Sequence, residues 1–146
     1  MSANELINAL RNHRISASEL LELTISHAER VSTANNPFAV KLYDRARDAA
    51  KNADALLLAN SLSEQELCGP LCGLPITIKD SQWLSRAPCS YRSETQKNLI
   101  PDEACATVKS LEEAGAIIFA KTTHCEFSLT GFMNRQGFIR HLIALT

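Results

Sequence analysis

The 146-residue sequence lacks any long apolar run and any strong excess of charge of one sign. No stretch approaches the roughly 18 consecutive apolar residues that a membrane-spanning helix needs. The opening MSANELINALRNHR also lacks the apolar core of a secretory signal. The formal net charge of −1 gives no electrostatic basis for a nucleic-acid or membrane-surface partner. We therefore expect a cytoplasmic protein that binds neither nucleic acid nor membrane.

The sequence also lacks the residue patterns that hold the common cofactors. Its five cysteines are odd in number and scattered, and Cys68 and Cys72 have no matching Cys or His pair at zinc-finger spacing. The phosphate-loop pattern G-x-x-x-x-G-K-[ST] is absent. Neither Cys72 nor Cys125 has a nearby His–acid pattern, so buried thiols are expected rather than nucleophiles. We expect no cofactor and no metal ion.

What the sequence does contain is an alternation of helical and strand patterns. Ser16 and Glu19 form a capping-box signature at the start of a long amphipathic helix. Further helices are expected at residues 3–12, 44–60 and 101–115. Strands are expected at 37–43, 75–79 and 116–122, with an irregular segment at 81–100. A helix that leads directly into a buried strand favours an α/β fold.

The sequence also predicts the ends of one of these helices and the buried face of another. In the helix at 101–115, Asp102 is expected to be the N-cap and Gly115 to end the helix. In the helix at 44–60, we expect the charged residues to face outward. Ala49, Ala53 and Leu56 are expected to face the core.

The stretch GPLCGLPITIKDS, residues 69–81, places Lys79 at the end of a short strand, behind a loop rich in glycine and proline. Alternation puts the two isoleucines of PITIK on one face of this strand and Thr77 and Lys79 on the other. A strand-end lysine usually extends its ammonium group into water. The alternative is a lysine enclosed in a pocket, where desolvation lowers its pKa and leaves a neutral amine that accepts a proton.

Two blocks of the sequence resemble the amidase signature family. CGPLCGLPITIKDS resembles the family's G-P-L-x-G-[IL]-P-[IV]-x-[IV]-K-D stretch, and PDEACATVKSLEEAGAIIFAKTTHCEFSLTG is similar to its P-D-x-x-A to K-T-x-x-x-E-F block. The resemblance covers residues 3–131. It implies the N-terminal part of that α/β fold, with a mixed sheet flanked by helices and incomplete in this chain. Residues 1–146 would then be one truncated domain, made of N-terminal helices (1–60), a motif-bearing α/β part (61–131) and a divergent tail (132–146).

The same resemblance implies a Ser–Ser–Lys hydrolase that cleaves the carbon–nitrogen bond of a small-molecule amide. In that family one serine attacks the carbonyl carbon, a second serine relays its proton, and the lysine that matches Lys79 is the base. Both serines lie in a downstream segment of the G-G-S-S-G-G-S type, which this sequence does not contain. We therefore expect a truncated chain that keeps Lys79 as its catalytic residue and does not hydrolyse amides alone.

Other polar residues in the two blocks have structural interpretations. Asp80 is expected to hydrogen-bond neighbouring groups rather than to carry protons. Lys121 and Thr122 end the later strand and are expected to line the pocket floor of a complete enzyme. Neither Glu126 nor His124 has a partner motif that supports catalysis or metal binding.

Two other interpretations remain open from the sequence. The chain could be a non-catalytic interaction module that uses its N-terminal helices to oligomerise, for instance as a homodimer. It could also be part of a glutamine-hydrolysing subunit of a transamidating complex, because that class shares the motif. In either case an incomplete sheet would leave the strands at 75–79 and 116–120 with unpaired edges.

Overall fold

The computed structural model describes residues 1–35, 37–61 and 68–128, and the predicted tail at 132–146 lies outside them. The helices are α1 (Ala3–Arg11), α2 (Ala17–Asn35), α3 (Tyr43–Ser61) and α4 (Ala106–Glu113), followed by the short 3-10 helix η1 (Glu126–Ser128). The strands are β1 (Phe38–Lys41), β2 (Pro75–Lys79) and β3 (Ile117–Thr122). The predicted α/β class is confirmed. Among the described residues, no helix combines the length and apolar character needed to cross a membrane.

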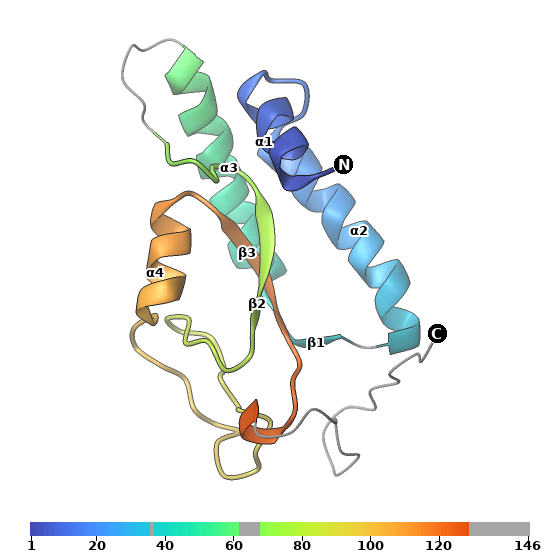
Figure 1. The fold of residues 1–146 in the computed structure, drawn as a ribbon, viewed down its shortest axis with the longest axis vertical. Coiled ribbons are helices and arrows are strands. Elements are labelled where there is room, and N and C mark those ends of the chain that lie inside the picture. The colour runs from blue at the N-terminus through green and yellow to red at the C-terminus, as the bar shows by residue number, and fades with distance from the viewer. Residues whose placement is uncertain (36, 62–67, 129–146) are drawn as a thin grey trace.

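The three strands form one mixed sheet in the order β1-β3-β2 (Figure 1). Strand β3 runs antiparallel to β1 and parallel to β2, in a register that places Lys79 opposite Thr122. Both edges of β3 are therefore paired, and the expected unpaired edge at 116–120 is wrong. Strand β2 has a partner on one side only among the described strands.

Successive residues of β3 supply two separate hydrophobic clusters, because side chains alternate across a strand. Ile117 and Phe119 pack with buried residues of α2 and α3. Ile118 packs on the opposite face with Ile78 of β2 and Val108 of α4. The long helices α2 and α3 thus cover one face of the sheet, and α4 covers the other (Figure 1).

The first turn of α2 is held by its own capping box and by α3. As predicted, the Glu19 N–H donates to Ser16 Oγ at 3.0 Å, and the Ser16 N–H donates to Glu19 Oε2 at 2.9 Å. The Asp54 carboxylate of α3 accepts from the Ala17 N–H at 2.6 Å, and from the Ser18 N–H at 3.2 Å and hydroxyl at 2.6 Å. One carboxylate therefore satisfies two N–H groups that the helix leaves without partners, and its charge suits the positive end of the helix dipole.

The loop that precedes β2 packs closely against the turn between α4 and β3. The Leu71 N–H donates to the Ala114 carbonyl at 2.8 Å, and the Gly73 N–H donates to the Gly115 carbonyl at 3.0 Å. A Cβ atom on Gly69 would lie 2.7 Å from the Ala114 backbone, so this close approach requires glycine. Gly115 has a φ angle of +87° and follows the end of α4, as predicted. These contacts fix the start of β2.

Helix α4 begins later than the sequence predicts. The predicted N-cap at Asp102 is wrong, because the helix begins at Ala106 with Cys105 in the N-cap position and no capping hydrogen bond from that side chain. The Cys105 N–H donates to the Trp83 carbonyl at 3.0 Å. This bond holds the chain before α4 against the irregular segment 81–100, so a helix does not form there.

Helix α3 turns a different face to the core from the predicted one. Its buried residues recur at spacings of four, three and four: Ala46, Ala50, Ala53 and Leu57. Of the three residues predicted to face inward, only Ala53 is buried. Ala49 is partly buried, and Leu56 is 42% exposed. Both sets have helical spacing, and packing against α2 and β3 selects the buried one.

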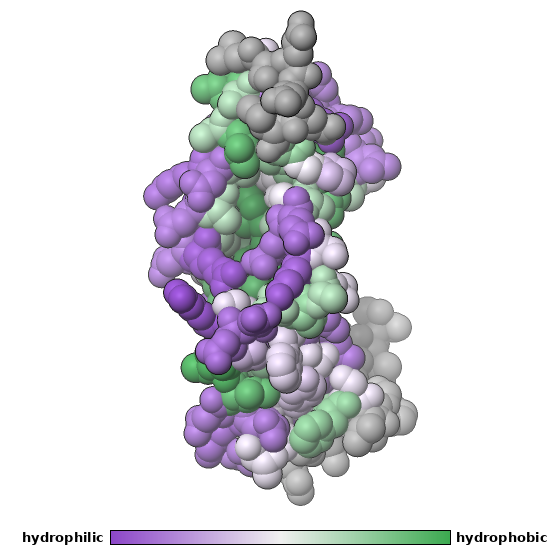
Figure 2. Space-filling model, turned by 90° about the vertical axis from the view of Figure 1, so that its left-hand side faces the viewer, coloured by the Kyte–Doolittle hydropathy of each residue, from purple (hydrophilic) through white to green (hydrophobic). Residues whose placement is uncertain are grey.

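Exposed large apolar side chains occur in several elements of the described chain: Met1, Leu23, Val31, Leu56, Leu58, Trp83, Ile100 and Phe127. Figure 2 views the molecule from the side on which α4 lies and shows apolar patches separated by hydrophilic side chains. The described residues of this face therefore do not form one continuous apolar surface of the kind that marks a stable interface.

We expect Asp54→Ala to lower the free energy of unfolding by about 2 kcal/mol, because it removes a carboxylate that caps the first turn of α2. Urea unfolding followed by circular dichroism measures the loss. The matched control is Asp48→Ala on the same helix, whose carboxylate makes an exposed pair with Lys51 at 3.7 Å. This control should cost less than about 0.5 kcal/mol. Equal losses for the two variants would contradict a link between α2 and α3 through Asp54.

Candidate functional site

Lys79 lies at the C-terminal end of β2, inside the motif that the sequence singled out. Its neighbour Ile78 is buried on the α4 side, while Thr77 and Lys79 are exposed, as the predicted alternation requires. The described residues do not form the predicted enclosure around the Lys79 side chain. The role of Lys79 as a base therefore stays a prediction.

Asp80, the next residue, is buried and fixed from several sides. Its carboxylate accepts hydrogen bonds from the Ser90 N–H at 3.2 Å and from the Ser90 hydroxyl at 2.8 Å. Its backbone N–H donates to the Thr122 carbonyl at 2.9 Å, and the Cys89 thiol donates to its carbonyl oxygen at 3.0 Å. Asp80 therefore makes hydrogen bonds with neighbouring groups, as the sequence predicted.

Lys121 of β3 is fully buried, and it is the lysine whose environment the sequence did not predict. Its Nζ lies 3.3 Å from Asp80 Oδ1 and donates to the Pro88 carbonyl at 2.5 Å. The parallel register places Lys121 beside Ile78, so its ammonium group reaches the residue that follows Lys79. The sequence contained one sign of this burial, because Lys121 directly follows the apolar run AIIFA. A buried ammonium group needs a carboxylate partner.

His124 is buried beside the same carboxylate. Its Nδ1 lies 2.5 Å from the Cys125 carbonyl oxygen, which can only accept, so we assign the ring proton to Nδ1. Its Nε2 lies 3.9 Å from Asp80 Oδ2 and has no hydrogen-bond partner among the described residues. Burial lowers the pKa of His124, although the Cys125 carbonyl and Asp80 act in the opposite direction. The ring is therefore neutral near pH 7.

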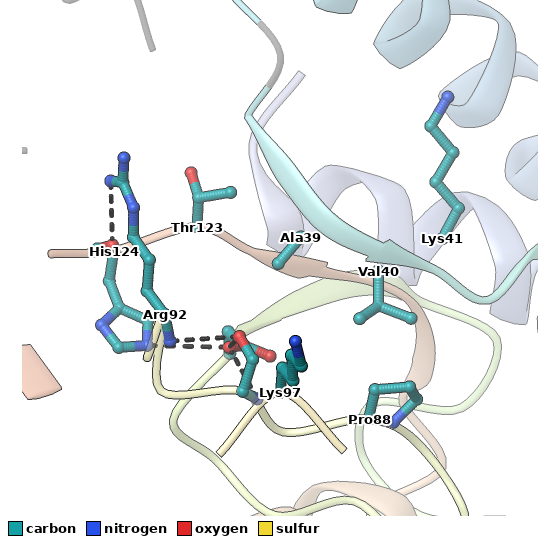
Figure 3. A pocket seen from close by; sticks show the side chains of 10 residues that line it. Ala39, Val40, Lys41, Pro88, Arg92, Lys97, Thr123 and His124 are labelled. Atoms are coloured by element: carbon teal, nitrogen blue, oxygen red, sulfur yellow. Dashed lines mark hydrogen bonds and ion pairs between the residues drawn. The ribbon is translucent and has the colours of Figure 1, made fainter. Parts of the chain in front are cut away.

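A pocket of about 550 Å³ opens beside this buried cluster (Figure 3). Asp80 and His124 line it together with residues of β1 and of the irregular segment 81–100. Lys79 is not among the lining residues. Lys121 is not among them either, although it contacts two residues that are, Asp80 and Pro88. The structure thus brings Asp80, Lys121 and His124 together and leaves Lys79 on the other face of the sheet.

The remaining candidates occupy structural positions. Cys72 is buried as expected, and burial raises its pKa to about 12, so it stays a protonated thiol. Cys125 is only partly buried. The Thr122 hydroxyl donates to the Ile78 carbonyl at 3.3 Å, and the Glu126 side chain lies outside the described part of the structure. Within the described residues, no three His, Cys, Asp or Glu side chains form a group that could hold a metal ion.

Asp80→Asn is expected to lower the free energy of unfolding by about 3 kcal/mol, because it leaves the buried Lys121 ammonium without its counter-charge. Chemical denaturation of this variant, of Lys121→Met and of the double variant forms a double-mutant cycle. The double variant should lose less than the sum of the two single losses. The exposed pair Asp48 and Lys51, treated identically, should show almost no coupling. Additive losses at Asp80 and Lys121 would contradict the ion pair.

Lowering the pH from 7.5 to 5.5 is expected to destabilise the fold through His124. Its folded-state pKa is lowered from the ordinary histidine value of 6.5, so the unfolded chain binds a proton first as the pH falls. The contribution of His124 is therefore fully present above pH 6.5 and decreases below it, by at most about 1.4 kcal/mol per pH unit. Carboxylates with lowered pKa values lose their contributions at lower pH, starting near 4.5.

Urea unfolding at a series of pH values measures this slope. His124→Gln should reduce the slope, and His27→Gln on the exposed face of helix α2 should leave it unchanged. An unchanged slope in His124→Gln would show that another group titrates in this range.

Comparison with known proteins identifies the family. The model of the Amidase family matches residues 19–140 of this chain. The chain is 28% identical over 137 residues to a subunit of the glutamyl-tRNA(Gln) amidotransferase of Heliobacterium modesticaldum, and 30% identical over the same length to the corresponding protein of Lachnospira eligens. Each match covers 94% of this chain and 27% of the relative. The chain thus spans about a quarter of the length of these relatives.

Solved structures of amidases share the same fold. A bacterial aryl acylamidase of the amidase signature family superposes with a TM-score of 0.81 at 20% identity, over 91% of this chain and 27% of its own. A structure described as an amidase gives a TM-score of 0.77 at 29% identity, over 88% of this chain and 28% of its own. The predicted mixed sheet flanked by helices is therefore the incomplete form of this fold. The chain belongs to the amidase signature family.

Proposed function

We propose that this chain supplies the lysine of a Ser–Ser–Lys amide hydrolase, with Lys79 as the base. The observation that carries this proposal is the position of Lys79, at the end of β2 within the motif that matches the family. The attacking serine and the relay serine belong to a segment that this sequence does not contain. The chain alone therefore holds a base and no nucleophile, and does not turn over amides.

The contacts of Asp80 support this proposal, because they hold the Lys79 backbone while its side chain remains exposed. Asp80 anchors the end of β2 through Thr122, Ser90 and Lys121, so the Lys79 backbone is fixed. A lysine acts as a base only when burial makes its neutral form accessible. The segment that brings the serines must therefore also cover the exposed face of β2 near Lys79.

The proposed substrate is a small-molecule amide, and the proposed setting is cytoplasmic, without nucleic acid or membrane. The leaving amine of an amide must be protonated as it departs, so a group that first takes and then returns a proton suits this reaction. A second candidate is glutamine, with the chain as part of a glutamine-hydrolysing subunit of a transamidating complex. The two amidotransferase subunits that it resembles at 28% and 30% identity favour this candidate.

The test compares the chain alone with a completed chain. Purified protein should show no hydrolysis of a panel of primary amides, anilides and glutamine. Joined to the part of the Heliobacterium modesticaldum relative that lies beyond the match, it should hydrolyse at least one of them. Lys79→Ala in this chimera should reduce the rate by about 10²–10⁴-fold, because a positioned general base is lost.

Lys79→Arg in the same chimera should be as inactive as Lys79→Ala, because arginine keeps the charge but does not give up its proton. Lys51→Ala on the exposed face of α3 should retain full activity. Turnover by the chain alone that is lost in Lys79→Ala would refute the claim that it lacks a nucleophile. An active Lys79→Ala chimera would refute the role of Lys79.

A further inference from the structure

Two of the five cysteines, Cys68 and Cys72, lie together in the loop that leads into β2. Both side chains are buried, and they belong to the same hydrophobic cluster. The Cys72 N–H donates to the Gly69 carbonyl at 3.1 Å, so the chain turns between the two cysteines. This turn brings the side chains together, and the Cys72 thiol makes a hydrogen bond with the Cys68 side chain.

The backbone around this pair is fixed by the turn between α4 and β3. The Leu71 N–H donates to the Ala114 carbonyl at 2.8 Å, and the Gly73 N–H donates to the Gly115 carbonyl at 3.0 Å. A Cβ atom on Gly115 would lie 2.8 Å from the Cα atom of Cys72, so this turn packs closely against Cys72. The contact between the two thiols is therefore a fixed feature of the fold.

The two thiols have different surroundings. The Asn60 side chain of α3 donates from Nδ2 to Cys68 Sγ at 3.2 Å. Burial raises the pKa of Cys72 to about 12, and its hydrogen bond with Cys68 acts in the same direction, because Cys72 is the donor in it. Cys72 thus keeps its proton, whereas Cys68 Sγ accepts hydrogen bonds from two donors. The thiolate of this pair therefore forms at Cys68.

A pocket of about 290 Å³ gives a small molecule access to the pair. Cys68, Gly69 and Cys72 line it, together with residues of α3, α4 and β3. The pocket is several times larger than the roughly 30 Å³ that a water molecule occupies in the liquid. Hydrogen peroxide is little larger than water, so it can reach both sulfur atoms.

We propose that Cys68 and Cys72 form a reversible disulfide when the chain meets a hydroperoxide, with Cys68 as the sulfur that attacks the peroxide. Two thiols that are already in contact need little movement to form this bond, and the pocket admits the oxidant. The oxidation needs neither Lys79 nor a serine. It is therefore independent of the proposed hydrolase activity.

The reaction proceeds in two balanced steps. The Cys68 thiolate attacks one oxygen of the peroxide, the O–O bond breaks, and Cys68 becomes a sulfenic acid while the other oxygen takes a proton and leaves as water. The Cys72 sulfur then displaces the hydroxyl group of the sulfenic acid, which leaves as water with the proton of the Cys72 thiol. Two electrons pass from the sulfur atoms to the peroxide.

The test treats the purified 146-residue chain with hydrogen peroxide, unfolds it, alkylates the remaining thiols with iodoacetamide and digests it with trypsin. Trypsin cleaves after lysine and arginine, so Cys68 and Cys72 fall in one peptide, residues 52–79. The other three cysteines each fall in a different peptide. Mass spectrometry should find the peptide 52–79 without alkyl groups and lighter than its reduced form by two hydrogen atoms. Dithiothreitol should restore both alkylation sites.

Three variants test the roles of the two sulfur atoms. Cys72→Ser should leave Cys68 as a sulfenic acid that dimedone traps, because the thiol that closes the disulfide is gone. Cys68→Ser should give at least about tenfold less dimedone adduct, because Cys72 stays protonated and the thiolate is the reactive form. The matched control Cys105→Ser removes a partly buried cysteine elsewhere and should leave the yield of the disulfide unchanged.

Three results would overturn the proposal. The first is a peptide 52–79 that stays fully alkylated after peroxide treatment. The second is a disulfide that joins Cys68 to a cysteine of another peptide. The third is an equal amount of dimedone adduct in Cys72→Ser and Cys68→Ser.

Discussion

The buried ion pair between Lys121 and Asp80 holds together the end of the sheet at which Lys79, Thr122 and His124 lie. Removing two charges from water costs several kcal/mol each, and the pair is tolerated only when hydrogen bonds satisfy what remains. Here Ser90 donates to Asp80 Oδ2 and the Pro88 carbonyl accepts from Lys121, both in the irregular segment 81–100. Asp80 Oδ1 has only the contact with Lys121 Nζ among the described residues. The ion pair therefore fixes β2, β3 and this segment to one another, although the segment has no regular secondary structure.

The register of β2 and β3 gives the two lysines opposite environments. Lys121 lies beside Ile78 and shares its buried face, whereas Lys79 is one residue further along and faces the other way. Successive side chains of a strand point to opposite faces, so a shift of β2 by one position would turn Lys79 toward the buried face. The anchored Asp80 prevents such a shift, because its carboxylate and its backbone both bind fixed partners.

Patterns in the sequence predicted the features that depend on residues only a few positions apart in the chain. The capping box of Ser16 and Glu19, the alternation along PITIK and the helix end at Gly115 all follow from backbone rules within a few residues. The start of α4 could not be predicted, because a bond from Cys105 to the distant Trp83 carbonyl decides it. The pairing of Asp80 with Lys121 was also beyond reach, since it depends on the register between two strands that are far apart in the chain.

Among the described strands, β2 has a partner on one side only, and the same strand carries the exposed side chain of Lys79. A strand edge with unsatisfied backbone groups favours the addition of another segment. A lysine becomes an effective base only after such a segment removes it from water. A segment that adds to β2 and carries the serines would meet both requirements at once. Completion of the sheet and activation of the base would then be a single event.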